Sequence, residues 1–457
     1  MKIKLHVTLL LLFTFLTVNA QTFQGDWYGK LDVGVKLPLI LHVQQIKKNK
    51  YDCQIDSPSQ KSFGLKAAVV KVKKDSIFME FKSLSATYRA KAVEGGLNGT
   101  FTQFGASYPL NLVTDSAAIA PPKRLQQVKA PFPYNVEEVT FKNEKDNVTL
   151  SGTLTYPKVG TSFKTVILVT GSGPQDRNEE MLDHKPFLVI ADYLTRNGIA
   201  VLRYDDRGVG KSTGSFSKST IYDFKRDASA AIAYLRTRSF VNQKYVGIIG
   251  HSEGGMIAEM LAAEEPRIVN FAIFLAAPAV PLDSLMVQQN RDVLASSKMT
   301  EEEIDTYIQG MEVLYKRLKI DDNCNQACLL ELMKENFADY DKNPMQYLGM
   351  ATQLSSDWFR EFLRFEPATY LEKITVPVLA LNGNKDVQVK GEPNLKAISI
   401  GLDKAGNNNY QTILYPNMNH LFQPCETGAV SEYQDIEITF SEKALKDITN
   451  WILIVGE

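Results

Sequence analysis

The stretch Tyr245–Leu261, which reads YVGIIGHSEGGMIAEML, decides the fold of this chain. Its first five residues predict a buried strand, and its last seven are good helix formers. Between them, Gly250-His251-Ser252-Glu253-Gly254 matches the pattern G-x-S-x-G. A strand, a sharp turn and a helix in this order present the central Ser at the top of a sheet, and the flanking Gly residues avoid a Cβ clash. We therefore predict that Ser252 is a nucleophile.

A serine hydroxyl needs a base within hydrogen-bond reach to attack a carbonyl. Beyond residue 20 the chain has four histidines, and His420 is the predicted base because it follows an expected strand near the C-terminus. His42 lies in a different part of the chain, and His251 sits inside the turn, where its ring cannot easily face its neighbour. His184 comes too early for the order Ser, acid, His that accompanies such a turn.

The acid that orients the base is expected at the end of the preceding strand. The segment 378–386 reads VLALNGNKD, an apolar run and a Gly turn that end on Asp386. Its carboxylate can reach the His420 imidazole and stabilise the imidazolium that forms on attack. Asp403, in a polar loop rich in Gly and Asn, is the weaker candidate.

A tetrahedral intermediate needs preorganised N–H donors for its oxyanion. The N–H of Glu253, just after the nucleophile, is one expected donor. The other is expected from the loop Gly171-Ser172-Gly173-Pro174, where small residues let the backbone approach a substrate. We choose Ser172, with Gly173 next, although the same residues are also typical of a plain tight turn.

From residue 138 onward, apolar runs alternate with helical patterns such as 187–196 and 223–235. This alternation predicts an α/β fold with a mostly parallel sheet covered on both faces, whose ligands lie at the carboxyl ends of the strands. The first two runs suggest an antiparallel pair. The expected strands are 139–141, 148–154, 166–169, 200–204, 246–249, 271–275, 378–381 and 412–415.

Between residues 283 and 371 the alternation stops and helical patterns take over. We expect this insertion to lie over the carboxyl edge of the sheet as a lid that excludes water. A helical decoration that only adds stability is the alternative. The expected helices are 299–318, 326–338 and 345–365.

Residues 21–115 have a different sequence pattern, in which short runs rich in Val, Ile, Phe and Tyr alternate with turn residues. This pattern predicts a small all-β domain, either a sandwich or a barrel, with a turn at 95–100. Residues 116–137 contain four prolines and read as a linker, so the second domain is expected to cover 138–457. The expected strands are 37–43, 76–81, 88–93, 101–104 and 110–113.

The first twenty residues are typical of a secretory signal peptide. Lys2 and Lys4 precede an apolar stretch, and Val18-Asn19-Ala20 offers a small-residue cleavage site. The apolar stretch is short for a bilayer span, and no later segment approaches eighteen continuous apolar residues. We therefore expect a periplasmic or secreted protein without a stable membrane anchor.

Charge and cysteine usage narrow the class further. Residues 21–457 carry 49 basic and 52 acidic side chains, and nothing here predicts nucleic acid or an anionic membrane as a partner, since both need a concentrated basic face. The four Cys match no zinc signature, and we expect no metal or cofactor. Cys324 and Cys328 can pair if a helix ends there, but two small buried residues are slightly favoured.

Three local patterns resemble known motifs but do not have the residues or the context that those motifs require. The loop 171–176 starts like a dinucleotide fingerprint but has Asp176 at the third Gly position, and Gly210-Lys211-Ser212 lacks the first Gly of a phosphate loop. The segment 204–208, which reads YDDRG, is interpreted as the turn after its strand, with Arg207 and one Asp in a structural ion pair.

Together these motifs resemble a group of exported bacterial carboxylesterases of the α/β-hydrolase fold, similar to serine aminopeptidases, that carry a β-rich N-terminal domain. The resemblance rests on segments 172–177, 184–187, 202–208, 382–386 and 419–422 and on the turn at Ser252. It implies short-chain acyl esters as small-molecule substrates. Many relatives in the wider superfamily carry His-Gly before the oxyanion loop, where this chain has Thr170-Gly171, which keeps the backbone donor and removes one side chain.

Ester hydrolysis is therefore the favoured function, with two alternatives. The same triad would also suit a peptidase acting on short peptides, with Glu253 or acids of the lid binding a free amine. The third reading is a non-enzymatic protein that binds glycans or lipids through its β domain and has a vestigial hydrolase core.

Overall fold

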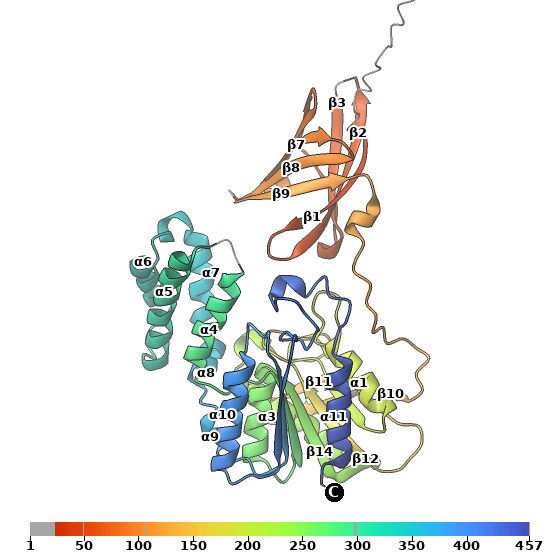
Figure 1. Ribbon diagram of the computed structural model, residues 1–457, viewed down its shortest axis with the longest axis vertical. Coiled ribbons are helices and arrows are strands. Elements are labelled where there is room, and N and C mark those ends of the chain that lie inside the picture. The colour runs from red at the N-terminus through yellow and green to blue at the C-terminus, as the bar shows by residue number, and fades with distance from the viewer. Residues whose placement is uncertain (1–22, 49, 105, 297–298, 457) are drawn as a thin grey trace, which may run out of the picture. The chain divides into compact units, whose positions relative to one another are not determined.

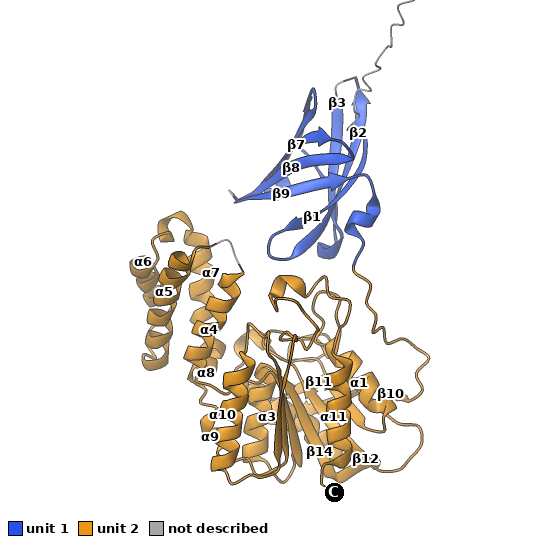
Figure 2. Ribbon diagram, in the orientation of Figure 1, with its two compact units in different colours: residues 1–121 blue, residues 122–457 orange. Residues whose placement is uncertain are grey.

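The computed structural model describes residues 23–48, 50–104, 106–296 and 299–456. These form two compact units, the first ending at Pro121 and the second beginning at Pro122 (Figure 2). The boundary falls inside the segment interpreted as a linker. The predicted signal peptide, residues 1–20, lies outside the described residues.

The first unit is built on one antiparallel sheet of nine strands in the order β4-β3-β2-β1-β9-β8-β7-β6-β5 (Figure 1). The sheet is a half-barrel rather than a two-layer sandwich. Three short 3₁₀ turns accompany it, at Pro58–Gln60, Lys82–Leu84 and Ser116–Ile119. The strands are β1 Gly25–Asp32, β2 Lys36–Lys47, β3 Lys50–Ser57, β4 Ser62–Lys66, β5 Val69–Lys73, β6 Ser76–Phe81, β7 Ala86–Val93, β8 Gly96–Gln103 and β9 Ala106–Val113.

Side chains alternate between buried and exposed along these strands, and the buried ones form the core of the first unit. Trp27, Leu41 and Tyr88 all point into it, as a period of two dictates. The Tyr88 ring takes the space beside Gly99, where an added Cβ would lie 2.6 Å from it. The turn predicted at 95–100 is therefore wrong beyond its first residue, because Gly99 serves close packing inside β8 rather than a bend.

The second unit contains an eight-stranded sheet in the order β10-β11-β13-β12-β14-β15-β16-β17. The first two strands pair antiparallel, β11 runs antiparallel to β13, and all later pairs are parallel. This confirms the predicted mostly parallel sheet. The strands are β10 Asn135–Asn143, β11 Val148–Tyr156, β12 Phe163–Val169, β13 Ala200–Tyr204, β14 Val241–His251, β15 Phe271–Leu275, β16 Val378–Gly383 and β17 Tyr410–Tyr415.

Helices cover both faces of this sheet (Figure 1). One apolar layer contains residues of α2, α3 and α10, and the layer on the other face contains residues of α1 and α11. Among the described helices, none is long and apolar enough to cross a membrane. Their bounds are α1 Pro186–Arg196, α2 Ile221–Arg236, α3 Glu253–Glu264, α9 Ala368–Leu371, α10 Gly391–Lys404 and α11 Glu442–Ile454, with 3₁₀ turns at Phe216–Lys218 and Val430–Glu432.

The helical insertion lies between β15 and β16 and has an apolar cluster of its own. The expected helix 345–365 is in fact two helices. The first ends at Leu354 with Ser355 as its C-cap, and Ser356 caps the second, its hydroxyl accepting from the Phe359 N–H at 3.2 Å. Cys324 and Cys328 form a disulfide, so the favoured reading of two unpaired residues is wrong. The helices are α4 Leu282–Ala295, α5 Glu301–Ile320, α6 Gln326–Asn336, α7 Pro344–Leu354 and α8 Asp357–Arg364, with a 3₁₀ turn at Tyr340–Lys342.

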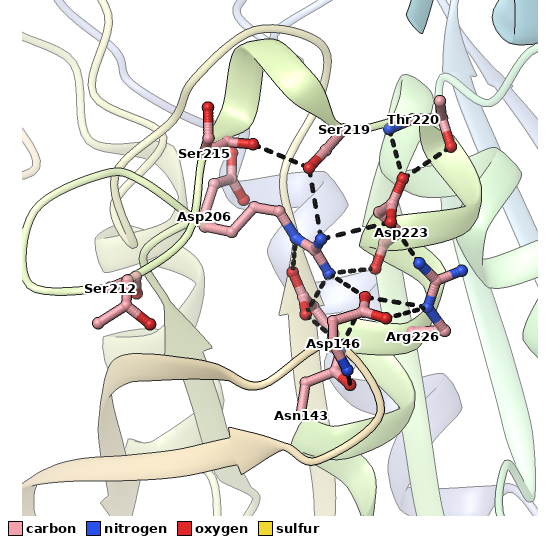
Figure 3. Close-up of polar contacts among 12 residues, drawn as sticks. Asn143, Asp146, Asp206, Ser212, Ser215, Ser219, Thr220, Asp223 and Arg226 are labelled. Atoms are coloured by element: carbon pink, nitrogen blue, oxygen red, sulfur yellow. Dashed lines mark hydrogen bonds and ion pairs between the residues drawn. The ribbon is translucent and has the colours of Figure 1, made fainter. Parts of the chain in front are cut away.

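Arg207, in the loop after β13, is the centre of a buried ion-pair network; Asp146, Asp223 and Arg226 of this network are labelled in Figure 3. The Nε of Arg207 donates to Asp227 Oδ2 at 2.6 Å, and its Nη2 donates to Asp227 Oδ1 and Asp146 Oδ2, both at 2.8 Å. Arg207 is therefore ion-paired, but the predicted partner within the turn is wrong, because its carboxylates come from α2 and the β10–β11 turn and not from the adjacent Asp205 or Asp206. The network fastens the loop after β13 to α2 and to the β10–β11 turn.

We expect Arg207→Met to lower the free energy of unfolding by about 3–5 kcal/mol, because Asp227 would be left buried without its counter-charge. Arg196→Met is the matched control. Its ion pair with Asp192 lies one helical turn away on α1 and is largely exposed, so its loss should cost less than about 1 kcal/mol. Urea unfolding measures both, and equal effects would contradict the structural role given to Arg207.

Candidate active site

Ser252 stands between β14 and α3 with φ 54° and ψ −119°. Its N–H donates to the Leu275 carbonyl at 2.8 Å, and its own carbonyl accepts from the Gly255 N–H at 2.8 Å. Gly250 and Gly254 are needed in this motif because the backbone segments around the turn pack directly against each other. A Cβ on Gly250 would lie 1.9 Å from the Gly254 carbonyl oxygen, and one on Gly254 would lie 2.2 Å from the Val169 carbonyl oxygen. The turn predicted from the sequence is thus formed, and strained.

His420 and Asp386 meet at the carboxyl edge of the sheet, in the loops after β17 and β16. The His420 Nδ1 lies 2.7 Å from Asp386 Oδ2, and both side chains are buried. The other carboxylate oxygen accepts from the N–H groups of Gln388 and Val389, each at 2.8 Å. These three contacts use both oxygens of the carboxylate and fix which face it turns to the imidazole.

The two loops can approach because Gly383 has no side chain. A Cβ there would lie 2.1 Å from the Met418 carbonyl oxygen. Asp403, the weaker candidate, instead accepts a bond from the Tyr410 hydroxyl at 2.7 Å. The structure therefore joins His420 to the acid that the sequence favoured.

His420 also lies against the turn that carries Ser252. The centroid of its ring is 4.7 Å from that of His251, and its carbonyl oxygen lies 3.0 Å from His251 Nε2. Because Ser252 directly follows His251, the structure brings the predicted nucleophile, base and acid to one corner of the sheet.

The loop predicted to supply an oxyanion donor also reaches this corner. A Cβ on Gly171 would lie 3.3 Å from the Ser252 Cβ, so the backbone of residues 171–173 passes directly beside the nucleophile. The Gly171 N–H donates to the Glu179 carboxylate at 2.8 Å, which leaves the next residue, Ser172, as the donor candidate from this loop. Glu253 is the first residue of α3, where N–H groups have no partner within the helix.

The Glu253 side chain points away from solvent and is fully buried. Its Oε1 accepts a hydrogen bond from Trp358 Nε1 of α8 at 2.8 Å, so the insertion contacts the residue next to the nucleophile. Burial raises the pKa of the Glu253 carboxyl to about 7, and the Trp358 bond opposes that shift. This contact joins residues 105 positions apart, and no local pattern in the sequence indicates it.

Sequence reasoning missed the structural role of two further residues of the site, His251 and Glu179. His251 Nδ1 lies 2.9 Å from Glu179 Oε1, the oxygen that also accepts from Gly171. Both side chains are buried. The sequence offered one weak signal, a histidine inside the turn that could not serve as the base, but nothing indicated its partner.

The other histidines have structural partners. His184 lies 3.0 Å from the Thr439 hydroxyl and 2.9 Å from the Tyr433 carbonyl oxygen. In the first unit, His42 lies between Asp26 and Asp56. Within the described part of the chain, no group of three or more His, Cys, Asp or Glu side chains is placed to hold a metal ion.

The parallel sheet, the strained serine turn and the paired imidazole and carboxylate define the class of α/β-hydrolases. Residues 185–424 match the family model described as "Serine aminopeptidase, S33". The chain belongs to this family and is a hydrolase, which confirms the resemblance found in its motifs.

The chain is also similar to several named proteins. Esterase EstD of Thermotoga maritima is 26% identical over 335 residues, or 72% of each chain. The human serine hydrolase BPHL is 28% identical over 162 residues, 33% of this chain and 50% of its own. Among solved structures, the esterase Pf2001 of Pyrococcus furiosus aligns with 74% of this chain and 99% of its own, at 19% identity and a TM-score of 0.45.

Replacing Glu253 by Gln should change how stability depends on pH. In the wild type the folded state keeps a proton that the unfolded state loses between about pH 4.5 and pH 7, so stability falls as pH rises through that window and levels off above it. Gln keeps the acceptor for Trp358 and removes the ionisation. We expect the stability of E253Q relative to wild type to be about 2–3 kcal/mol more favourable at pH 8 than at pH 5.

Urea unfolding at the two pH values measures this difference. Glu312→Gln, at an exposed position of α5, controls for loss of a surface charge and should leave the profile unchanged. Parallel pH profiles for wild type and E253Q would show that Glu253 is ionised in both the folded and the unfolded state.

Proposed function

We propose that this protein hydrolyses short-chain carboxylic esters through an acyl-enzyme formed on Ser252, with His420 as base and Asp386 as the residue that orients it. The observation that carries the proposal is the 2.7 Å contact between His420 and a buried Asp386, formed beside a strained serine turn. The name of the relative EstD, an esterase matched over 72% of this chain, favours esters as the substrate class.

In the first half of the reaction, His420 takes the proton of the Ser252 hydroxyl as its oxygen attacks the ester carbonyl. Asp386 stabilises the imidazolium that forms, and the N–H groups of Ser172 and Glu253 donate to the oxyanion. The tetrahedral intermediate then collapses, the C–O bond to the alcohol breaks, and His420 returns the proton to the leaving alkoxide.

The second half repeats the sequence with water. His420 deprotonates a water molecule that attacks the acyl carbonyl, and the bond to Ser252 Oγ breaks as that oxygen regains the proton. Free acid and free enzyme result. No step needs a cofactor, since the chain supplies base, nucleophile and donors.

Ser252→Ala should lower kcat for p-nitrophenyl acetate and butyrate by on the order of 10⁴-fold or more, because the acyl group loses its acceptor. Steady-state kinetics measure the loss. Labelling of the full chain by a fluorophosphonate, absent in the variant, would separate an active serine from a vestigial core. Undiminished turnover by S252A would reject the assignment.

The peptidase alternative requires a carboxylate that can receive a free amine. Glu253 does not offer one, because its side chain is buried and already accepts from Trp358. The surroundings of Glu253 therefore favour ester hydrolysis over a peptidase that binds the free amine of its substrate at this residue.

We accordingly expect kcat/KM for p-nitrophenyl butyrate to exceed that for alanine p-nitroanilide by on the order of 10³-fold, a difference of about 4 kcal/mol in transition-state stabilisation. Parallel assays of the two chromogenic substrates on the same preparation measure it. A preference for the aminoacyl amide would instead establish the peptidase.

Export to the periplasm or beyond is also a proposal, supported by the charge, apolar run and small residues of positions 1–20.

A further inference from the structure

His251 has acceptors at both of its ring nitrogens. Nδ1 faces Glu179 Oε1 at 2.9 Å, and Nε2 faces the backbone carbonyl oxygen of His420 at 3.0 Å. A carbonyl oxygen can only accept, and Glu179 Oε1 already accepts from the Gly171 N–H at 2.8 Å. A neutral imidazole carries a single N–H, so only the doubly protonated ring can donate to the Glu179 carboxylate and to the His420 carbonyl oxygen at once.

We propose that His251 is held as an imidazolium that, with Glu179, fixes the position of His420 relative to Ser252. The role for catalysis rests on the proposed function, whereas the charge state does not. His251 is a positioning residue, because it acts through the backbone of His420.

A second buried histidine in the same unit provides an internal comparison. His184 is as deeply buried and also places Nε2 against a backbone carbonyl oxygen, that of Tyr433 at 2.9 Å. Its Nδ1, however, faces the hydroxyl of Thr439, which can donate as well as accept. A neutral ring satisfies both contacts of His184, and burial lowers the pKa of this imidazole.

The electrostatic surroundings of His251 agree with the hydrogen-bond geometry. Burial by itself would lower the pKa of this imidazole, but the Glu179 carboxylate, the His420 carbonyl and the Asp386 charge together more than offset burial. The net result is a raised pKa. Glu179, Asp386 and His420 are the titratable groups that face this ring from the loops after β12, β16 and β17.

The Glu179–His251 pair joins three loops that come from three different strands. The Glu179 carboxylate accepts from the Gly171 N–H, next to the oxyanion loop. His251 belongs to the serine turn and contacts Glu179 through Nδ1. Its Nε2 contacts the backbone carbonyl oxygen of His420. Such a pair fixes the distance between donor loop, nucleophile and base before substrate arrives. Misplacement of a reacting group by about 1 Å can cost on the order of 10²-fold in rate.

Nitrogen-15 NMR of histidine-labelled S252A full-length protein at about pH 8, where an ordinary imidazole is neutral, tests the charge state. We expect both ring nitrogens of His251 to be protonated and His184 to show one protonated and one bare nitrogen. Single substitutions of His6, His42, His184 and His251 by Gln each remove one signal and so assign it, and the remaining signal of the five belongs to His420. A neutral His251 at this pH would overturn the proposal, and the measurement is independent of whether the protein hydrolyses esters.

Steady-state kinetics test the positioning role. For H251Q we expect kcat for p-nitrophenyl acetate to fall on the order of 10- to 100-fold, with KM changed far less, because the reacting groups are misplaced while substrate binding is retained. If Glu179 without its partner prevents folding, the double variant E179Q/H251Q removes the pair together and should show the same loss of kcat. Thr439→Val, which alters the surroundings of His184 instead, is the matched control. An unchanged kcat in a folded variant would overturn the positioning role.

Discussion

The backbone of Ser252 is held in a conformation that residues with a side chain rarely adopt, and the rest of the hydrolase unit is arranged to hold it there. Such a conformation costs about 1–3 kcal/mol and persists only where its surroundings leave no alternative. Here the strand before it and the helix after it are both buried, and Gly250 and Gly254 pack backbone against backbone. This conformation leaves the Ser252 Cβ 3.3 Å from the position that a Cβ on Gly171 would take, beside the loop after β12.

Much of this arrangement could be predicted from the sequence because its signals are local. The serine turn is recognisable from five residues, and the acid is recognisable from an apolar run that ends in a Gly turn. The assignment of His420 needed only the chain order of the three groups and the small number of histidines. In the first unit, β2, β6, β7, β8 and β9 were predicted at least in part, whereas β1, β3, β4 and β5 were not, because each of these four contains Gly, Asp or Lys residues that are depleted in strands.

The parts that could not be predicted are contacts between distant segments. The bond from Trp358 to Glu253 spans 105 residues, and the pair of Glu179 and His251 spans 72. Each residue of these pairs is ordinary in its own stretch, and only the fold gives it a partner. The partner of Arg207 was uncertain for the same reason, since the carboxylate that neutralises it lies on α2 rather than beside it in the chain.

The insertion between β15 and β16 has its own apolar cluster, formed by residues of α5, α6, α7 and α8. The strands on either side of it pair directly with each other in the parallel sheet, so the sheet is continuous without the insertion. A segment attached in this way can diverge, lengthen or be exchanged between lineages without disturbing the serine turn. Substrate preference and catalytic chemistry can thus evolve on separate parts of the chain, with the tryptophan of α8 marking where they meet.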